Sequence, residues 1–229
     1  MSEWWTYHLS SFVLFSPRSY LRLLERYNDD VRPLQLVTMA AAIAIVLWAR
    51  SRRSWPSRAI PLALASMWLL VALAFHVRRY ATINWAAQYF AIAFVAEALV
   101  LAWIGTARGR LRFGAHRSLQ QRAAYVIVAA ALAGVPLAEW LAGREWRQLE
   151  WFGVAPDPTV IGTLGMLLLA SHKPPWATLV IPLLWCGVNG AFQWALGLRD
   201  ALALPLTAVL VLATQLAPLS SRSPRPSAR

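Results

Sequence analysis

The sequence predicts an all-helical, polytopic membrane protein with seven transmembrane spans. Of the 229 residues, 59% are hydrophobic and only 14% are charged, whereas a soluble domain has about a quarter charged residues. Several separate apolar runs approach the roughly 20 residues that a helix needs to cross a bilayer. The basic residues lie between these runs, so the net charge of +12 is typical of topology signals and lipid contacts and not of nucleic-acid binding.

Residues 1–33 are too polar to span and predict a short amphipathic helix that lies in the membrane interface. Ser16 and Pro17 have the pattern of an N-cap followed by proline at the first helical position. Leu21 and Leu24 fall on one side of this helix. We expect aromatic residues to anchor the segment, namely Trp4, Trp5, Phe12 and Phe15. A helix packed on the membrane bundle is the alternative.

The transmembrane bundle is expected over residues 34–219. Its seven spans are expected at residues 34–48, 59–77, 84–105, 123–141, 159–171, 176–198 and 201–219. Gly134 and Pro136 predict a kink in the fourth span. The fifth run is only about 20 Å long as a helix, so six spans plus a re-entrant fifth segment is the alternative. Residues 220–229 are Ser, Pro and Arg, which predicts a disordered basic tail.

The charges predict the orientation of the seven spans. One side of the membrane would hold 13 basic residues and no acidic residue, namely Arg50, Arg52, Arg53, Arg58, Arg108, Arg110, Arg112, Arg117, Arg122, Lys173, Arg222, Arg225 and Arg229. The other side would hold nine basic and nine acidic residues. The positive-inside rule places the first side in the cytoplasm. We therefore expect a bacterial inner (plasma) membrane protein with a periplasmic N-terminus and a cytoplasmic C-terminus.

Glu97 is the only acidic residue deep within an apolar run, and an intramembrane carboxylate is a candidate proton relay, ion site or counter-ion. The alternative is a protonated side chain that makes an interhelical hydrogen bond. At matching depth lie Ser66, Thr214 and Gln215. We expect Glu97 to point into the bundle and to bond to one of these or to water.

A second group of intramembrane polar residues lies nearer the periplasmic side: His76, Gln88, Asn189 and Gln193. Asn189 and Gln193 are four residues apart and therefore share a helix face. Residues of this type hold helices together more often than they bind a solute. His76 is expected to be a structural hydrogen-bonding residue at the interface.

The sequence predicts no metal, no cofactor and no soluble-enzyme chemistry. The single cysteine, Cys186, excludes an intrachain disulfide and a cysteine zinc site. No phosphate-binding loop, nucleophile elbow, zinc-protease or dinucleotide motif is present. Catalysis by a membrane enzyme through His76 or Glu97 is the least supported hypothesis.

The loop before the fifth run carries a Phe-Gly-x-x-Pro-x-Pro-Thr signature, formed by Phe152, Gly153, Pro156, Asp157, Pro158 and Thr159. The prolines cannot continue a regular helix. Asp157 and Thr159 can cap the N-terminus of the fifth run, where a negative charge is favourable. We expect this loop to fold back against the outer mouth of the bundle, near His76 and Asn84.

Four stretches resemble a family of uncharacterised bacterial multi-pass membrane proteins, known only as a domain of unknown function. They are Tyr27-Asn28 with Pro33 and Gln35; Trp68 and His76 with Ile83-Asn84 and Ala86-Ala87; Gly134 with Pro136; and the loop signature, Val154 included, with Pro182-Leu183-Leu184-Trp185. The chain departs from the expected pattern at Asp157, where the family would have cysteine, and at Glu97, where it would have glutamine. The resemblance implies the membrane architecture and no activity.

Two functions remain from the sequence. One is a small permease or channel-like protein whose solute vestibule is the periplasmic polar group. The other is a non-catalytic accessory or scaffold subunit of a membrane complex. The expected partners are the lipid bilayer and either other membrane subunits or a small solute, with no nucleic acid.

Overall fold

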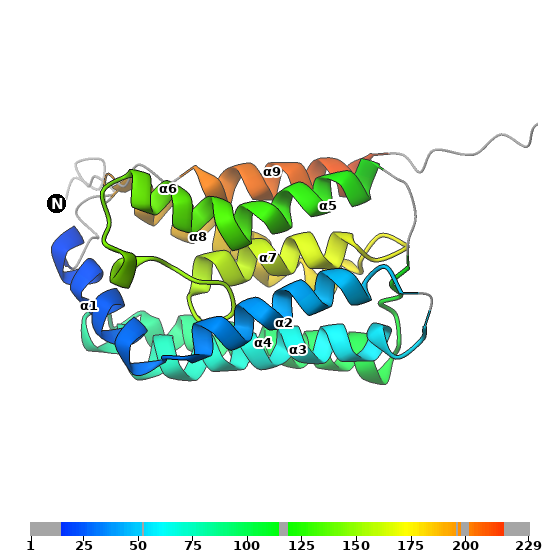
Figure 1. Cartoon of the computed structure of the whole chain (residues 1–229), viewed down its shortest axis with the longest axis horizontal. Helices are drawn as coiled ribbons and strands as arrows, with labels where there is room; N and C mark the ends of the chain where they lie inside the picture. The colour runs from blue at the N-terminus through cyan, green and yellow to red at the C-terminus, as the bar shows by residue number, and fades with distance from the viewer. Residues whose placement is uncertain (1–14, 52, 115–118, 196, 198–201, 218–229) are drawn as a thin grey trace, which may run out of the picture.

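The computed structural model describes residues 15–51, 53–114, 119–195, 197 and 202–217, and this part of the chain is helical with no named strand (Figure 1). The α-helices are α1 (Pro17–Asp30), α2 (Leu34–Trp48), α3 (Pro56–Leu70), α4 (Ala87–Leu101), α5 (Leu119–Ala129), α6 (Val135–Leu141), α7 (Pro156–Leu168), α8 (Val180–Ala195) and α9 (Ala203–Leu216). The short elements are η3 (Val71–Val77), η4 (Tyr80–Thr82), η5 (Ala102–Ala107), η6 (Ala130–Gly134), η7 (Trp146–Gln148) and η8 (Trp176–Thr178). Trp4, Trp5, Phe12 and the tail at 220–229 lie outside the described residues.

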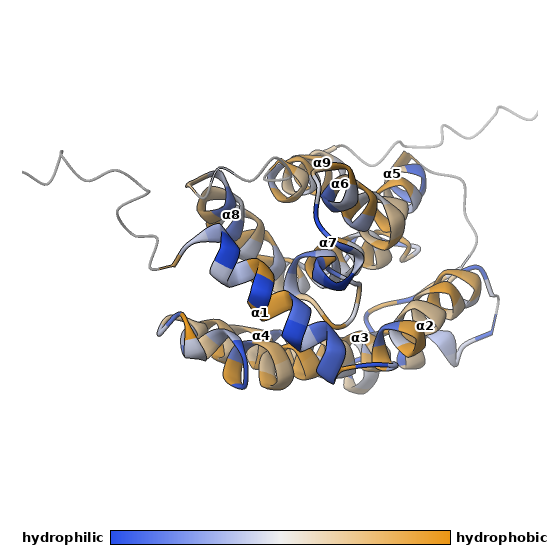
Figure 2. Ribbon diagram, turned by 60° about the vertical axis from the view of Figure 1, so that its left-hand side comes forward, coloured by the Kyte–Doolittle hydropathy of each residue, from blue (hydrophilic) through white to orange (hydrophobic). Residues whose placement is uncertain are grey.

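The helices α2 to α9 run along the long axis of the molecule around α7. Figures 1 and 2 show α2, α3 and α4 on one side of α7 and α5, α6, α8 and α9 on the other. Helix α7 packs against α5, η6, α8, α9 and α3. The largest fully buried side chains include Trp68, Phe94 and Phe152, so the core surrounds this central helix.

Every residue of α7 is buried, and small residues on it let its neighbours approach closely. A Cβ atom on Gly162 would lie 2.4 Å from Phe152 Cε2, and one on Gly165 would lie 2.9 Å from the backbone N of Val128 in α5. Beyond the end of α7, the amide of Ser171 donates to Arg112 O at 2.7 Å. Helix α7 therefore lies inside the bundle along its long axis, and it begins inward of the end that α1 covers (Figure 1).

Three continuous helices are long and apolar enough to cross a membrane: Pro56–Thr82, Ala87–Ala107 and Leu119–Leu141. A fourth is obtained if the bent pair α1 and α2 is taken as one span. Seven spans are therefore not supported, and the reason is length. Helices α7, α8 and α9 have 13, 16 and 14 residues, which is about 20, 24 and 21 Å of rise against a hydrocarbon core of about 30 Å.

Each of the three long helices contains a π-helical stretch: η3, η5 or η6. A π turn widens the helix and often bends it. In the third long helix η6 comes immediately before Pro136, which is near the start of α6. Proline has no N–H to donate to the preceding turn. The position of the expected kink at Gly134 and Pro136 thus coincides with the end of a π-helical stretch.

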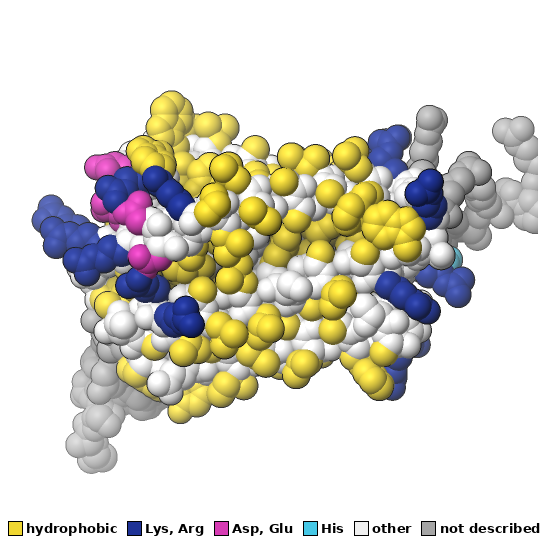
Figure 3. Space-filling view, turned by 60° about the horizontal axis from the view of Figure 1, so that its bottom comes forward, with side chains coloured by type: hydrophobic (Ala, Val, Ile, Leu, Met, Phe, Trp, Pro, Cys, Tyr) yellow, Lys and Arg dark blue, Asp and Glu magenta, His cyan; other side chains and the backbone are white. Residues whose placement is uncertain are grey.

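The face of the molecule seen in Figure 3 carries a wide apolar belt between two charged ends. Exposed large apolar side chains come from several helices, among them Leu36, Leu73, Ile92, Leu184 and Val209. One end, which we call the basic end, carries only cations in the described part of the chain: Arg50, Arg53, Arg58, Arg108, Arg110, Arg112, Arg122 and Lys173. The other, which we call the mixed-charge end, carries arginines together with the described carboxylates other than Glu97. Exposed apolar area on this scale marks an interaction surface.

Helix α1 lies across the mixed-charge end, turned by 82° from α2. It begins as expected, with Ser16 as N-cap and Pro17 in its first turn, and the amide of Ser19 donates to Ser16 Oγ at 3.3 Å. Its apolar face is packed on the bundle through Tyr20, Leu23, Leu24 and Tyr27. This packing corresponds to the alternative given above for residues 1–33.

Candidate functional site

The described mixed-charge end contains a cluster of buried ionisable side chains centred on Asp157, in the first turn of α7. Asp157 is 4% exposed. It accepts hydrogen bonds from three side chains of α8: Trp185 Nε1 at 2.8 Å, Asn189 Nδ2 at 2.7 Å, and Gln193 Nε2. Three N–H donors directed at one carboxyl group suit its ionised form. The positive end of the α7 dipole also favours a negative charge here.

Spacing along the two helices explains this contact. Trp185, Asn189 and Gln193 follow each other at intervals of four residues, so all three lie on one face of α8. Pro156 and Pro158 place Asp157 in the first turn of α7, because proline is tolerated where the helix N–H groups have no partner inside the helix. The α8 face and the α7 terminus therefore meet at one carboxylate.

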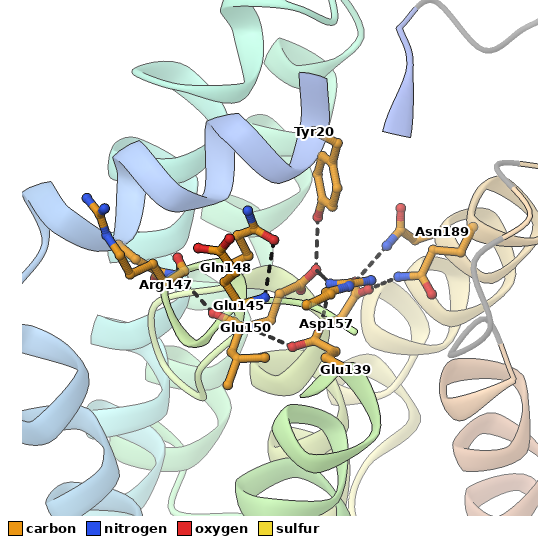
Figure 4. A network of polar contacts seen from close by, with 12 residues as sticks. Tyr20, Glu139, Glu145, Arg147, Gln148, Glu150, Asp157 and Asn189 are labelled. Carbon is orange, nitrogen blue, oxygen red and sulfur yellow. Dashed lines mark hydrogen bonds and ion pairs between the residues drawn. The ribbon is translucent and has the colours of Figure 1, made fainter. Parts of the chain in front are cut away.

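A second set of charges lies beside Asp157 (Figure 4). Arg144 Nη1 is 2.7 Å from Glu139 Oε1 and 3.6 Å from Glu150 Oε1. Tyr20 of α1 donates to Glu150 Oε1 at 3.0 Å, and the Glu150 amide donates to Glu139 Oε2 at 2.7 Å. Burial, and next the Glu150 charge, raise the pKa of Tyr20 well above its ordinary value of 10.0, so its hydroxyl remains a donor.

The loop that leads into α7 is held by side chains of α1 and α2. Tyr27 Oη donates to Val154 O at 2.7 Å, and Thr38 Oγ1 donates to Phe152 O at 2.7 Å. Asn28 Nδ2 donates to two loop carbonyls, Arg147 O and Leu149 O. The loop thus folds back onto the bundle, where its bonds go to α1 and α2 and not to His76 or Asn84.

The signature glycine and threonine shape the same loop. Gly153 has a φ of +81°, and a Cβ atom there would lie 2.6 Å from Thr38 Cβ. Glycine alone has both the backbone freedom and the space for this position. The Gly153 amide donates to Thr159 Oγ1 at 2.8 Å. The signature residues therefore fix the approach to Asp157, while Phe152 packs on Gly162 of α7.

A pocket of about 210 Å³ borders the cluster between η6, α6, α7, α8 and α9. Four of its lining residues are polar: Glu139, Asp157, Gln193 and Thr207. The remainder of the lining is aliphatic. A second, water-sized cavity of about 10 Å³ touches Tyr20, Asn189 and Gln193.

His76 is completely buried in η3 among aromatic rings, with ring centroids 4.7 Å from Phe94 and 5.4 Å from Trp185. Neither ring nitrogen has a hydrogen-bond partner among the described residues. The expected hydrogen-bonding role at the interface therefore finds no partner in the described part of the chain, because aromatic rings surround the imidazole. His76 nevertheless contacts Trp185, which donates to Asp157.

Glu97 points into the bundle, as expected, and is 0% exposed. The expected bond to Ser66, Thr214 or Gln215 is not formed, because neither carboxylate oxygen has a hydrogen-bond partner in the described part of the chain; the expected alternative, a bond to water, stays a prediction. Ser66 is exposed and donates to Leu62 O, and Thr214 donates to Val211 O, each within its own helix.

The structure therefore brings together only part of the residues that the sequence singled out. Asn189, Gln193 and Asp157 meet at one site, whereas Gln88 is exposed on α4 and Glu97 lies apart. Sequence reasoning missed Glu139, Arg144, Glu150 and Tyr20 as a buried group. Glu139, an acidic residue near the end of an apolar run, is the feature of the sequence that could have indicated this buried group.

Comparison with known proteins identifies a family but no function. A family model described as "Family of unknown function (DUF6064)" matches residues 18–222, a range that begins at the second residue of α1 and includes the whole of α2 to α9. No curated protein and no solved structure matches the chain. The match covers most of the 229 residues, and the chain therefore belongs to the DUF6064 family of unknown function.

Proposed function

We propose that the protein is a small integral membrane permease or channel-like protein that takes a small cationic solute, such as an amine, into the pocket beside Asp157. The observation that carries this proposal is the pocket itself, an aliphatic pocket with two carboxylates, Glu139 and Asp157, in its wall. Ligand sites are typically mostly apolar with a few convergent polar groups. A volume of about 210 Å³ has room for several water molecules, which suits a small solute.

The charge of the cluster supports the sign of the solute. Its described residues include three carboxylates (Glu139, Glu150 and Asp157) and one guanidinium, Arg144. A protonated amine can donate hydrogen bonds to carboxylate oxygens in the pocket wall, and its carbon skeleton suits the aliphatic part of the lining.

The form of α7 supports a transport role. Transporters often place their sites where short or broken helices end inside the bundle. Helix α7 is short and buried over its whole length, and its N-terminal turn carries Asp157 between Pro156 and Pro158.

The apolar belt and the charged ends support a membrane position. The basic end would face the cytoplasm of a bacterial inner membrane by the positive-inside rule, which places the mixed-charge end and the pocket on the periplasmic side. A reporter inserted after Gly109 should be cytoplasmic and one after Gly143 periplasmic. Both glycines have positive φ and no atom within 4 Å of a Cβ position, so these insertions are tolerable; two reporters on the same side would overturn the topology.

Binding is tested by thermal unfolding in detergent with small primary amines and with alcohols of the same size, at equal ionic strength. The amines should raise the melting temperature and the alcohols should not. Thr207→Leu fills the pocket without removing a charge and should abolish the shift, whereas Gln88→Leu, on the exposed face of α4, should keep it. Equal shifts with amines and alcohols would contradict the proposed solute class.

Transport is tested by uptake of the stabilising amine into proteoliposomes, with Thr207→Leu as the inactive control. Uptake no faster than in protein-free vesicles would favour the alternative, an accessory or scaffold subunit. The observation that favours this alternative is the burial of every residue of α7, which fills the centre of the described bundle with packed side chains. Affinity purification in mild detergent, followed by mass spectrometry, should then recover a membrane partner in fixed ratio.

A further inference from the structure

A different pocket at the mixed-charge end collects arginines from two parts of the chain. It has a volume of about 270 Å³ and lies between α1 and the turn that joins η3 to η4. Its lining includes Arg22 and Arg26 from α1, Arg79 from the turn, and the hydroxyl residues Ser19 and Thr82. Arg22 and Arg26 are four residues apart, so both lie on the same face of α1.

The described charges around this pocket are strongly unbalanced. Arg79 forms an ion pair with Asp30. No ion pair within the described residues involves Arg22 or Arg26. Arginines that line one pocket give it a positive potential, which attracts an anion. Planar N–H donors together with hydroxyl groups are the set that recognises phosphate oxygens.

The position of the pocket is that of a lipid headgroup. Exposed apolar side chains lie close in sequence to Arg79 and Thr82, namely Val77, Trp85 and Tyr89. The pocket therefore lies at the rim of the apolar belt, where Trp and Tyr are enriched at membrane interfaces. Leu23 and Ile83 give it an apolar floor. A phosphate in the pocket would leave an attached acyl chain free to run along the exposed face of α4.

We propose that Arg22, Arg26 and Arg79 form a binding site for a phosphate group, filled by the headgroup of an anionic phospholipid. This site is separate from the cation pocket, which is lined by other residues, and does not depend on it. Free inorganic phosphate has the same chemistry without the acyl chain, so the test must distinguish the two sources.

The experiment is native mass spectrometry of the full chain, released from nanodiscs that contain equal amounts of phosphatidylglycerol and phosphatidylcholine. The wild type should retain one phosphatidylglycerol in preference to phosphatidylcholine. Arg22→Gln/Arg26→Gln should weaken this retention roughly tenfold or more, since each basic residue near an anionic surface contributes a several-fold gain in affinity. Arg22→Lys/Arg26→Lys should give an intermediate result, because lysine keeps the charge but loses the planar fork.

The matched control is Arg50→Gln/Arg53→Gln, which removes two arginines from the basic end and should leave retention unchanged. Equal melting temperatures show that the variants are folded. The proposal is overturned if both glutamine pairs lose phosphatidylglycerol retention equally. It is also overturned if the wild type shows neither a preference for phosphatidylglycerol nor a shift of the melting temperature in millimolar inorganic phosphate. A shift with inorganic phosphate that Arg22→Gln/Arg26→Gln abolishes, without lipid preference, supports the phosphate site and assigns it to a soluble anion.

Discussion

Replacing Asp157 with alanine tests whether the carboxylate holds α7 and α8 together. The change removes the acceptor of three α8 donors, Trp185, Asn189 and Gln193. Hydrogen bonds between membrane helices contribute about 0.6 kcal/mol each, which gives a lower limit of about 2 kcal/mol. Bonds to a charged group contribute about 1.5–3 kcal/mol each, which sets a much higher limit.

We therefore expect Asp157→Ala to lower the free energy of unfolding by about 3 kcal/mol, or the melting temperature by roughly 6–12 °C for a chain of this size. Asp157→Asn keeps one carbonyl acceptor and should lose about half as much. The assay is thermal unfolding in detergent followed by tryptophan fluorescence. Gln88→Ala, on the exposed face of α4, is the control and should melt like the wild type.

A double-mutant cycle separates this contact from other effects of the substitution. Asp157→Ala combined with Gln193→Ala should show a coupling energy of about 0.5–3 kcal/mol, the range for residues in one hydrogen-bond network. Additive effects, or an Asp157→Ala protein that melts with the wild type, would refute the conclusion that this carboxylate joins the two helices.

Three further predictions concern packing, pH and a helix end. Gly165→Ala should destabilise the fold by a few kcal/mol, because the added Cβ atom would overlap Val128 of α5. Gly187→Ala is the control: its Cβ atom would meet nothing within 4 Å, so it should be neutral or slightly stabilising. Thermal unfolding measures both variants. Burial raises the pKa of Tyr27 above its ordinary value of 10.0. The hydroxyl of Tyr27 therefore contributes fully to the free energy of unfolding below pH 10, and this contribution is lost as the pH rises further. The Tyr27→Phe protein should be less stable than the wild type at pH 8, but its stability should fall less steeply above pH 10. Lys173 donates to two carbonyls at the C-terminal end of α9, Gln215 O and Ala217 O, so Lys173→Met should cost about 1 kcal/mol and speed amide exchange there.

Hydrophobic runs predicted the helices well, because a long run of apolar residues between charged loops rarely adopts a structure other than a helix. The expected span at 34–48 coincides with α2, and the fifth run at 159–171 overlaps α7 except at its ends. Counting these runs as spans failed for the shorter helices. Apolar character alone cannot distinguish a helix that contacts lipid from one, such as α7, that is enclosed by protein.

The candidate site was predictable where the information is local. The interval between Asn189 and Gln193 and the helix-start position of Asp157 are both visible in the sequence. Their contact is tertiary and could not be inferred, and the same holds for the ion pairs of Arg144. His76 and Glu97 were placed by depth along straight α-helices, a rule that gives no information on the lateral neighbours that decide hydrogen bonding.

The π turns have a consequence for how these helices tolerate changes in length. One extra residue in a turn rotates everything beyond it by about 100° relative to a regular helix. In the helix Pro56–Thr82, η3 thus sets which face carries His76, while the preceding α3 keeps Trp68 directed at Thr163 of α7. Deleting one residue within η3 can restore a regular helix, but it turns the segment that leads to Arg79 away from α1. The length of this stretch, as much as its composition, therefore determines which side chains reach the mixed-charge end.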